Sequence, residues 1–107
     1  MKNIPAPSHS GPRTRADGEI VHVTEWVIGA YTLRKSEEPG YTGWNVRAAG
    51  YDLPDIDDAA PYGQRPEFGV NWSAHGVQRA ADARDYAEQI MRAADAAATF
   101  TEIVAND

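Results

Sequence analysis

The sequence predicts an α+β fold in which a three-stranded antiparallel sheet packs against one long C-terminal helix. β-Branched and aromatic residues concentrate between residues 19 and 75, and turn-forming residues divide that region into three strand-like runs. After residue 79 the apolar residues change to helical spacing. The 107 residues allow one domain at most, and we place it at residues 18–107 behind a disordered tail at residues 1–17.

The tail is predicted from its composition. Prolines stand at positions 5, 7 and 12, and large apolar side chains are almost absent after Ile4. Such a segment cannot bury enough surface to offset the entropy that it loses on ordering.

Three strands are expected before the helix, at residues 19–35, 41–53 and 67–75. The first run changes its apolar phase, which requires a bulge, a bend or a break, and Gly29 is the natural place for it. A Pro-Gly turn separates the first two runs, so the second strand should lie antiparallel to the first.

Each predicted strand contributes one tryptophan: Trp26, Trp44 or Trp72. We expect the three rings to share an apolar face, because each contributes a large buried area. The alternative is a stacking platform for single-stranded nucleic acid, but that platform also needs a basic groove. The net charge of −6 argues against such a groove, so it favours packing of the three rings in the core.

One helix is expected over residues 79–104. Its small and apolar side chains recur alternately three and four residues apart, which places them in one stripe: Ala80, Ala83, Ala87, Ile90, Ala94, Ala97, Thr101 and Val104. The helix would be roughly 40 Å long, so one end should project beyond the sheet. The stripe can pack on the sheet, or it can form a helix–helix seam with another chain.

No catalytic, cofactor or metal motif stands out. The acidic cluster at residues 52–58 lacks the glycine and the spacing of a calcium loop. Ser73 and His75 would lie on one face of a strand, too far apart for direct contact. His22 and His75 could meet across strands, but no third metal ligand has a recognisable spacing. The absence of cysteine excludes thiolate chemistry.

The charge and the apolar pattern also limit the possible partners. An acidic chain is unlike a nucleic-acid-binding surface, which would need a basic patch assembled from Arg47, Arg65, Arg79 and Arg84. No apolar run is long enough to span a bilayer, and the N-terminus lacks the apolar core of a secretion signal. We therefore expect a cytoplasmic protein without a membrane segment.

Self-association is expected because the phase change in the first strand places apolar residues on both of its faces, and one helix cannot cover both. A twofold homodimer is the commonest way to close such a patch. The expected self-association surface combines residues of the first strand with residues of the helix end: Trp26, Tyr31, Leu33, Ala97, Phe100 and Val104.

The helix segment at residues 82–96, DARDYAEQIMRAADA, resembles the ending of small uncharacterised proteins from actinobacteria and their phages. In those proteins a strand leads into an alanine-rich amphipathic helix. The resemblance implies a high-GC bacterial or phage origin, and it implies no activity and no functional residues.

These observations together predict a non-enzymatic protein–protein interaction module that forms a homodimer and needs no cofactor. One concrete form is a phage or prophage accessory factor that binds a host protein. The first alternative is a small dimeric regulatory module that contacts nucleic acid. The second is an enzyme with an unrecognised site, which would require a deep pocket where His22, Ser73, His75 or the acids at 52–58 converge.

Overall fold

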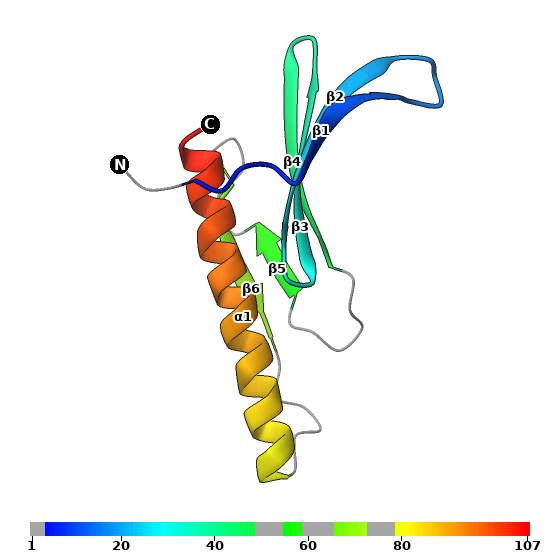
Figure 1. Ribbon diagram of the computed structural model, residues 1–107. Helices are drawn as coiled ribbons and strands as arrows, with labels where there is room; N and C mark the ends of the chain where they lie inside the picture. The colour runs from blue at the N-terminus through cyan, green and yellow to red at the C-terminus, as the bar shows by residue number, and fades with distance from the viewer. Residues whose placement is uncertain (1–3, 49–54, 59–65, 73–78) are drawn as a thin grey trace.

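The computed structural model describes residues 4–48, 55–58, 66–72 and 79–107 (Figure 1). Within them the elements are β1 (His9–Thr14), β2 (Ile20–Ile28), β3 (Tyr31–Glu38), β4 (Tyr41–Ala48), β5 (Asp55–Asp58), β6 (Phe68–Asn71) and α1 (Ala80–Ala105). Strands β1 to β4 form an antiparallel sheet in sequence order, and β5 pairs with β6. The α+β class with one long C-terminal helix is confirmed, but the main sheet has four strands instead of three.

The phase change in the expected first strand is a turn. β2 and β3 form a hairpin in which Ile28 lies opposite Tyr31, leaving two residues for the loop. Gly29 has a φ of 59°, and a glycine at this position is typical of a tight hairpin turn. The prediction of a break at Gly29 is therefore correct, and residues 19–35 supply two strands instead of one.

The Pro-Gly turn is also where the sequence places it. Glu38 lies opposite Tyr41, and Gly40 has a φ of 79°. Proline fixes the first loop residue and glycine accepts the positive φ of the second. β4 is therefore antiparallel to its neighbour, as predicted.

The prediction of a disordered tail at residues 1–17 is wrong for β1. This strand pairs with β2 from His9 to Thr14, and the turn that joins the two strands contains Gly18 with a φ of 88°. The Asp17 carboxylate accepts a hydrogen bond from the backbone N–H of Glu19 at 3.0 Å. Low apolar content does not prevent this strand from forming, because its exposed residues are held by the backbone ladder to β2 and by the turn that follows.

The sheet has two different faces. We call the inner face the one that packs on α1, and its largest side chains are Trp26, Tyr31, Leu33, Trp44 and Val46. The rings of Trp26 and Trp44 stack with their centroids 6.1 Å apart. From the other side, Phe100 of α1 is fully buried and meets Phe68 of β6 edge to face. One core thus joins the sheet, the small hairpin and the helix.

Trp72 does not join this core, so the expected face of three tryptophans is wrong for one of them. Trp72 is 57% exposed. β6 ends at Asn71, so Trp72 follows the paired segment and the alternation of a strand no longer applies to it. Most of the remainder of the predicted third strand, from residue 73 on, lies outside the described residues.

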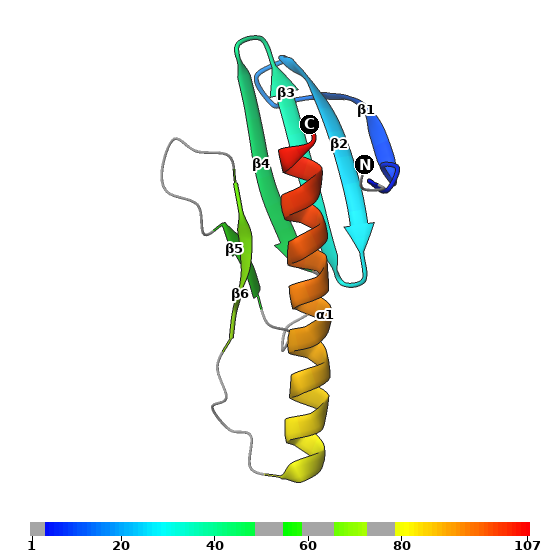
Figure 2. The ribbon, with the colours of Figure 1, turned by 90° about the vertical axis from the view of Figure 1, so that its left-hand side faces the viewer.

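α1 begins and ends within one residue of the predicted helix, but it packs through a different stripe. Its buried residues are Ala93, Ala96, Ala97, Phe100, Ile103 and Val104. Ala97 and Val104 belong to the predicted stripe and Phe100 to the residues that widen it, but Ala94, in the middle of that stripe, is exposed. Figure 2 shows that the first half of the helix runs beyond the end of the sheet, as its predicted length indicated. Ala80, Ala83 and Ala87 lie in this half and are exposed.

Candidate interaction surfaces

The expected self-association surface is buried within the chain. Trp26, Tyr31, Leu33, Ala97, Phe100 and Val104 all belong to the hydrophobic core. The reason is the turn at Gly29, because it brings Leu33 opposite Trp26 and Tyr31 opposite Ile28 on the same inner face. One helix can therefore cover both sets, and none of the six residues is available to a partner in this fold.

The acid-base candidates do not form a site within the described residues. Ser73 and His75 lie outside them, and so does Asp52. Asp55, Asp57 and Asp58 lie exposed on β5. In the part of the chain that the structure describes, no group of three or more His, Asp or Glu side chains could hold a metal ion.

The structure reveals one serine–histidine contact that the sequence reasoning missed, because it treated β1 as tail. The Ser10 Oγ lies 2.9 Å from the His22 Nε2 across the β1–β2 ladder. A serine is activated in this way only when an acid orients the imidazole and donors stabilise an oxyanion. Among the described residues no carboxylate hydrogen-bonds His22, and both side chains are exposed on strands. The contact therefore stabilises the pairing of β1 with β2.

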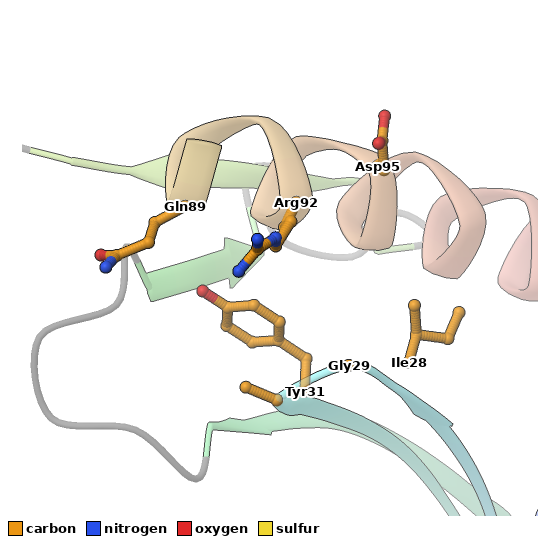
Figure 3. Close-up of a pocket in the computed structure, with 7 residues that line it drawn as sticks. Ile28, Gly29, Tyr31, Gln89, Arg92 and Asp95 are labelled. Carbon is orange, nitrogen blue, oxygen red and sulfur yellow. The ribbon is translucent and has the colours of Figure 1, made fainter. Parts of the chain in front are cut away.

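A cavity of about 360 Å³ lies between the β2–β3 turn and α1 (Figure 3). The hairpin contributes Ile28 and Tyr31 to its wall, and the helix contributes Gln89 and Arg92. In Figure 3 the hydroxyl of Tyr31 lies toward Arg92, whereas the carboxylate of Asp95 is turned away. Burial, with a further contribution from the charge of Asp55, raises the pKa of Tyr31, so its hydroxyl remains protonated near neutral pH. A neutral phenol beside a guanidinium gives binding groups but no acid–base pair.

The face of α1 that points away from the sheet carries a second row of small apolar side chains. We call this row the exposed stripe, and it consists of Ala87, Met91, Ala94 and Ala98. Met91 is 66% exposed. It lies about 180° around the helix from the buried Phe100, because nine residues at 3.6 per turn make two and a half turns. Charged residues border the exposed stripe along one side only: Glu88, Arg92, Asp95 and Glu102.

The outer face of the main sheet, which lies opposite the inner face, is rich in arginine. Strand register places Arg13, Arg34 and Arg47 on this face. Val21 and Val23 lie on it too, and they are only 6% and 5% exposed although neither belongs to the core under α1. They line one cavity together with Arg13 and Arg34, and long aliphatic stems such as those of arginine can cover apolar neighbours.

The basic patch that nucleic acid would need is not assembled from the expected residues. Arg47 lies on the outer face of the sheet, whereas Arg79 and Arg84 lie at the start of α1, which projects beyond the end of the sheet (Figure 2). Arg65 lies outside the described residues. The arginines that do cluster, Arg13 and Arg34, come from strands that only the tertiary structure brings together.

Comparisons with models of protein families, with curated proteins and with solved structures find no match. Within the described residues, the single helix is too polar to cross a membrane. The function is therefore inferred from the surfaces themselves.

Proposed function

We propose that this protein is a non-enzymatic protein–protein interaction module and that it forms a homodimer through the exposed stripe of α1. The observation that carries the proposal is that α1 is apolar on two opposite sides, of which the sheet covers only one. An exposed row of Ala87, Met91, Ala94 and Ala98 along a projecting helix is the kind of apolar patch that marks a contact site.

The composition of the exposed stripe suits a second helix. Alanine side chains allow two helix axes to approach to the lower end of the usual range, about 8 Å. Methionine is flexible and fills irregular gaps in such a contact. A twofold axis through the exposed stripe would bring it against itself, so that the same residues are used in both protomers.

Catalysis is not part of the proposal. The Ser10–His22 contact lacks an orienting acid within the described residues, and the cavity beside Tyr31 holds a protonated phenol. Neither arrangement supplies a nucleophile or a general base.

Sedimentation equilibrium at micromolar concentration tests the proposal. The wild-type chain should sediment as a dimer, and Ala94→Arg should sediment as a monomer, because it places a charge in the middle of the seam. Ala81→Arg is the matched control, since it makes the same change at an exposed helix position on the charged side. A monomeric wild-type protein, or equal dissociation of both variants, would rule out the exposed stripe as the dimer contact.

A further inference from the structure

The cavity beside the β2–β3 turn lies between the hairpin and α1 (Figure 3), apart from the exposed stripe, and we call it the turn cavity. Gly29 has no side chain and Ala30 has only a methyl group, so these two turn residues leave space below the helix. Ile28 and the ring of Tyr31 form an apolar wall. The volume of about 360 Å³ falls in the range of small-molecule sites, about 300–1,000 Å³.

The helix lines the turn cavity with two sets of hydrogen-bond donors. Gln89 is half-buried, and within the described residues its side-chain amide makes no hydrogen bond. The Nη2 of Arg92 lies 3.7 Å from a carboxylate oxygen of Glu88, which is beyond hydrogen-bond distance. This ion pair therefore uses none of the five N–H donors of the guanidinium. A ligand oxygen that enters the turn cavity can accept hydrogen bonds from both side chains.

The charges around the turn cavity favour an uncharged ligand. Glu88 and Asp95 flank Arg92 on α1, so two acids accompany one base. Asp55 adds a negative charge that is close enough to act on Tyr31. A ligand anion would meet this excess of negative charge in a chain whose net charge is already −6. A ligand cation would have to lie beside the guanidinium of Arg92.

The apolar wall and the donors together define the ligand. An aromatic ring pairs well with a tyrosine ring and packs on an aliphatic side chain, which suits Tyr31 and Ile28. A purely apolar ligand would bury the donors of Gln89 and Arg92 without partners, and that is costly. A carbonyl oxygen on the ring satisfies the donors without adding a charge.

We propose that the turn cavity binds a small, uncharged aromatic molecule that carries a carbonyl oxygen. Its ring lies between Ile28 and Tyr31, and its carbonyl oxygen accepts hydrogen bonds from Arg92 and Gln89. This binding site is independent of the homodimer contact, because the exposed stripe lies on the face of α1 that points away from the sheet.

Fluorescence titration of the full chain with prodan, an uncharged naphthyl ketone, tests the proposal. Prodan should bind saturably, one molecule per chain, and its emission should shift to the blue because the ring leaves water. Ala30→Leu places a larger side chain in the turn cavity, so it should weaken binding at least about tenfold. Ala81→Leu is the matched control, since it makes the same change at an exposed helix position and should leave the affinity unchanged.

Arg92→Met tests the contact with the carbonyl oxygen, because it keeps the aliphatic stem and removes the donors. Binding should weaken by about tenfold, the loss from one hydrogen bond to a charged group. The emission of bound prodan should also move further to the blue, since a hydrogen bond to its carbonyl shifts emission to the red. Loss of a merely structural side chain would not produce this second shift. Arg84→Met makes the same change about two turns earlier on α1, and it should alter neither the affinity nor the emission.

Displacement of prodan tests the charge of the ligand. Acetylnaphthalene should displace prodan at a lower concentration than naphthoate, which has the same ring and a negative charge. Tighter binding of naphthoate would assign the turn cavity to carboxylates and overturn the proposal.

Three further results would also overturn the proposal: no saturable binding of prodan, an equal loss of affinity in Ala30→Leu and Ala81→Leu, or loss of binding in Ala94→Arg. The last result would place prodan on the exposed stripe. Circular dichroism establishes that each variant is folded, and sedimentation of Ala94→Arg tests the homodimer separately.

Discussion

The Nζ of Lys35 on β3 lies 2.5 Å from the Oδ1 of Asp107, just beyond the end of α1. The same ammonium group lies 3.5 Å from Glu37 and 5.4 Å from the centre of the Trp44 ring. The contact joins the end of the helix to the middle of the sheet, across 72 positions in the sequence. It therefore adds one polar contact between the end of the helix and the sheet to the apolar contacts of the core.

This contact should make the free energy of unfolding depend on pH in the alkaline range. Burial lowers the pKa of Lys35, but the hydrogen bond with Asp107 and the charges of Asp107 and Glu37 outweigh it, so the pKa is raised above its ordinary value of 10.5. The raised pKa means that the charged form favours the folded state. The resulting stability is present below pH 10.5 and is lost as the pH rises through the folded-state pKa.

Lys35→Met tests this dependence, because it keeps the aliphatic stem and removes the charge. Near neutral pH we expect a loss of at most about 1 kcal/mol in the free energy of unfolding, since Asp107 is partly exposed to solvent. Above pH 10.5 the difference from the wild type should shrink. Urea unfolding over a series of pH values measures it, and a difference that stays constant with pH would show that Lys35 acts through packing alone.

Two isoleucines should separate the core from the surface. Ile103 is 3% exposed in α1, whereas Ile20 is 66% exposed at the start of β2. Ile103→Ala should cost about 2–5 kcal/mol, the usual range for a large core residue. Ile20→Ala should cost at most about 1 kcal/mol, the strand preference of a β-branched residue. Denaturant unfolding of the two variants measures the loss in the free energy of unfolding for the same substitution at a buried and at an exposed position. Similar losses would contradict the packing of Ile103 in the core.

Gly29 should be more sensitive to substitution than Gly11. Gly29 has a φ of 59°, so Gly29→Ala should destabilise the protein by about 1–2 kcal/mol. Gly11 lies in β1 without a positive φ and with open space around its Cα. Gly11→Ala should therefore be neutral, or stabilising by up to about 1 kcal/mol. Thermal unfolding measures both, and an equal effect of the two changes would indicate that the β2–β3 turn differs from the one described.

Local chemistry allowed several elements to be predicted. The Pro-Gly pair defines the β3–β4 turn. Proline permits only a narrow range of φ, and glycine accepts the positive φ that the second loop residue adopts. The bounds of α1 were predicted within one residue from apolar periodicity. β1 does not follow from apolar content, because its residues are mostly exposed, and only the turn residues Asp17-Gly18 indicate a hairpin there.

The candidate surfaces were less predictable, because they depend on which groups the fold covers. The stripe predicted on α1 contains both Ala94 and Ala97, and its three-and-four spacing fits a buried row that includes Ala97 as well as an exposed row that includes Ala94. Periodicity cannot distinguish them, since both satisfy the geometry of a helix. The inner face of the sheet decided between them, and it left the row with Ala94 exposed.

The sequence by itself determined the α+β class, the long helix and the positions of two turns, because these follow from interactions between residues that are close in the chain. Only the tertiary structure decided that Arg13 and Arg34 meet at Glu25. That meeting depends on the register of three strands, and register is set by hydrogen bonds between distant segments and by the burial of one sheet face.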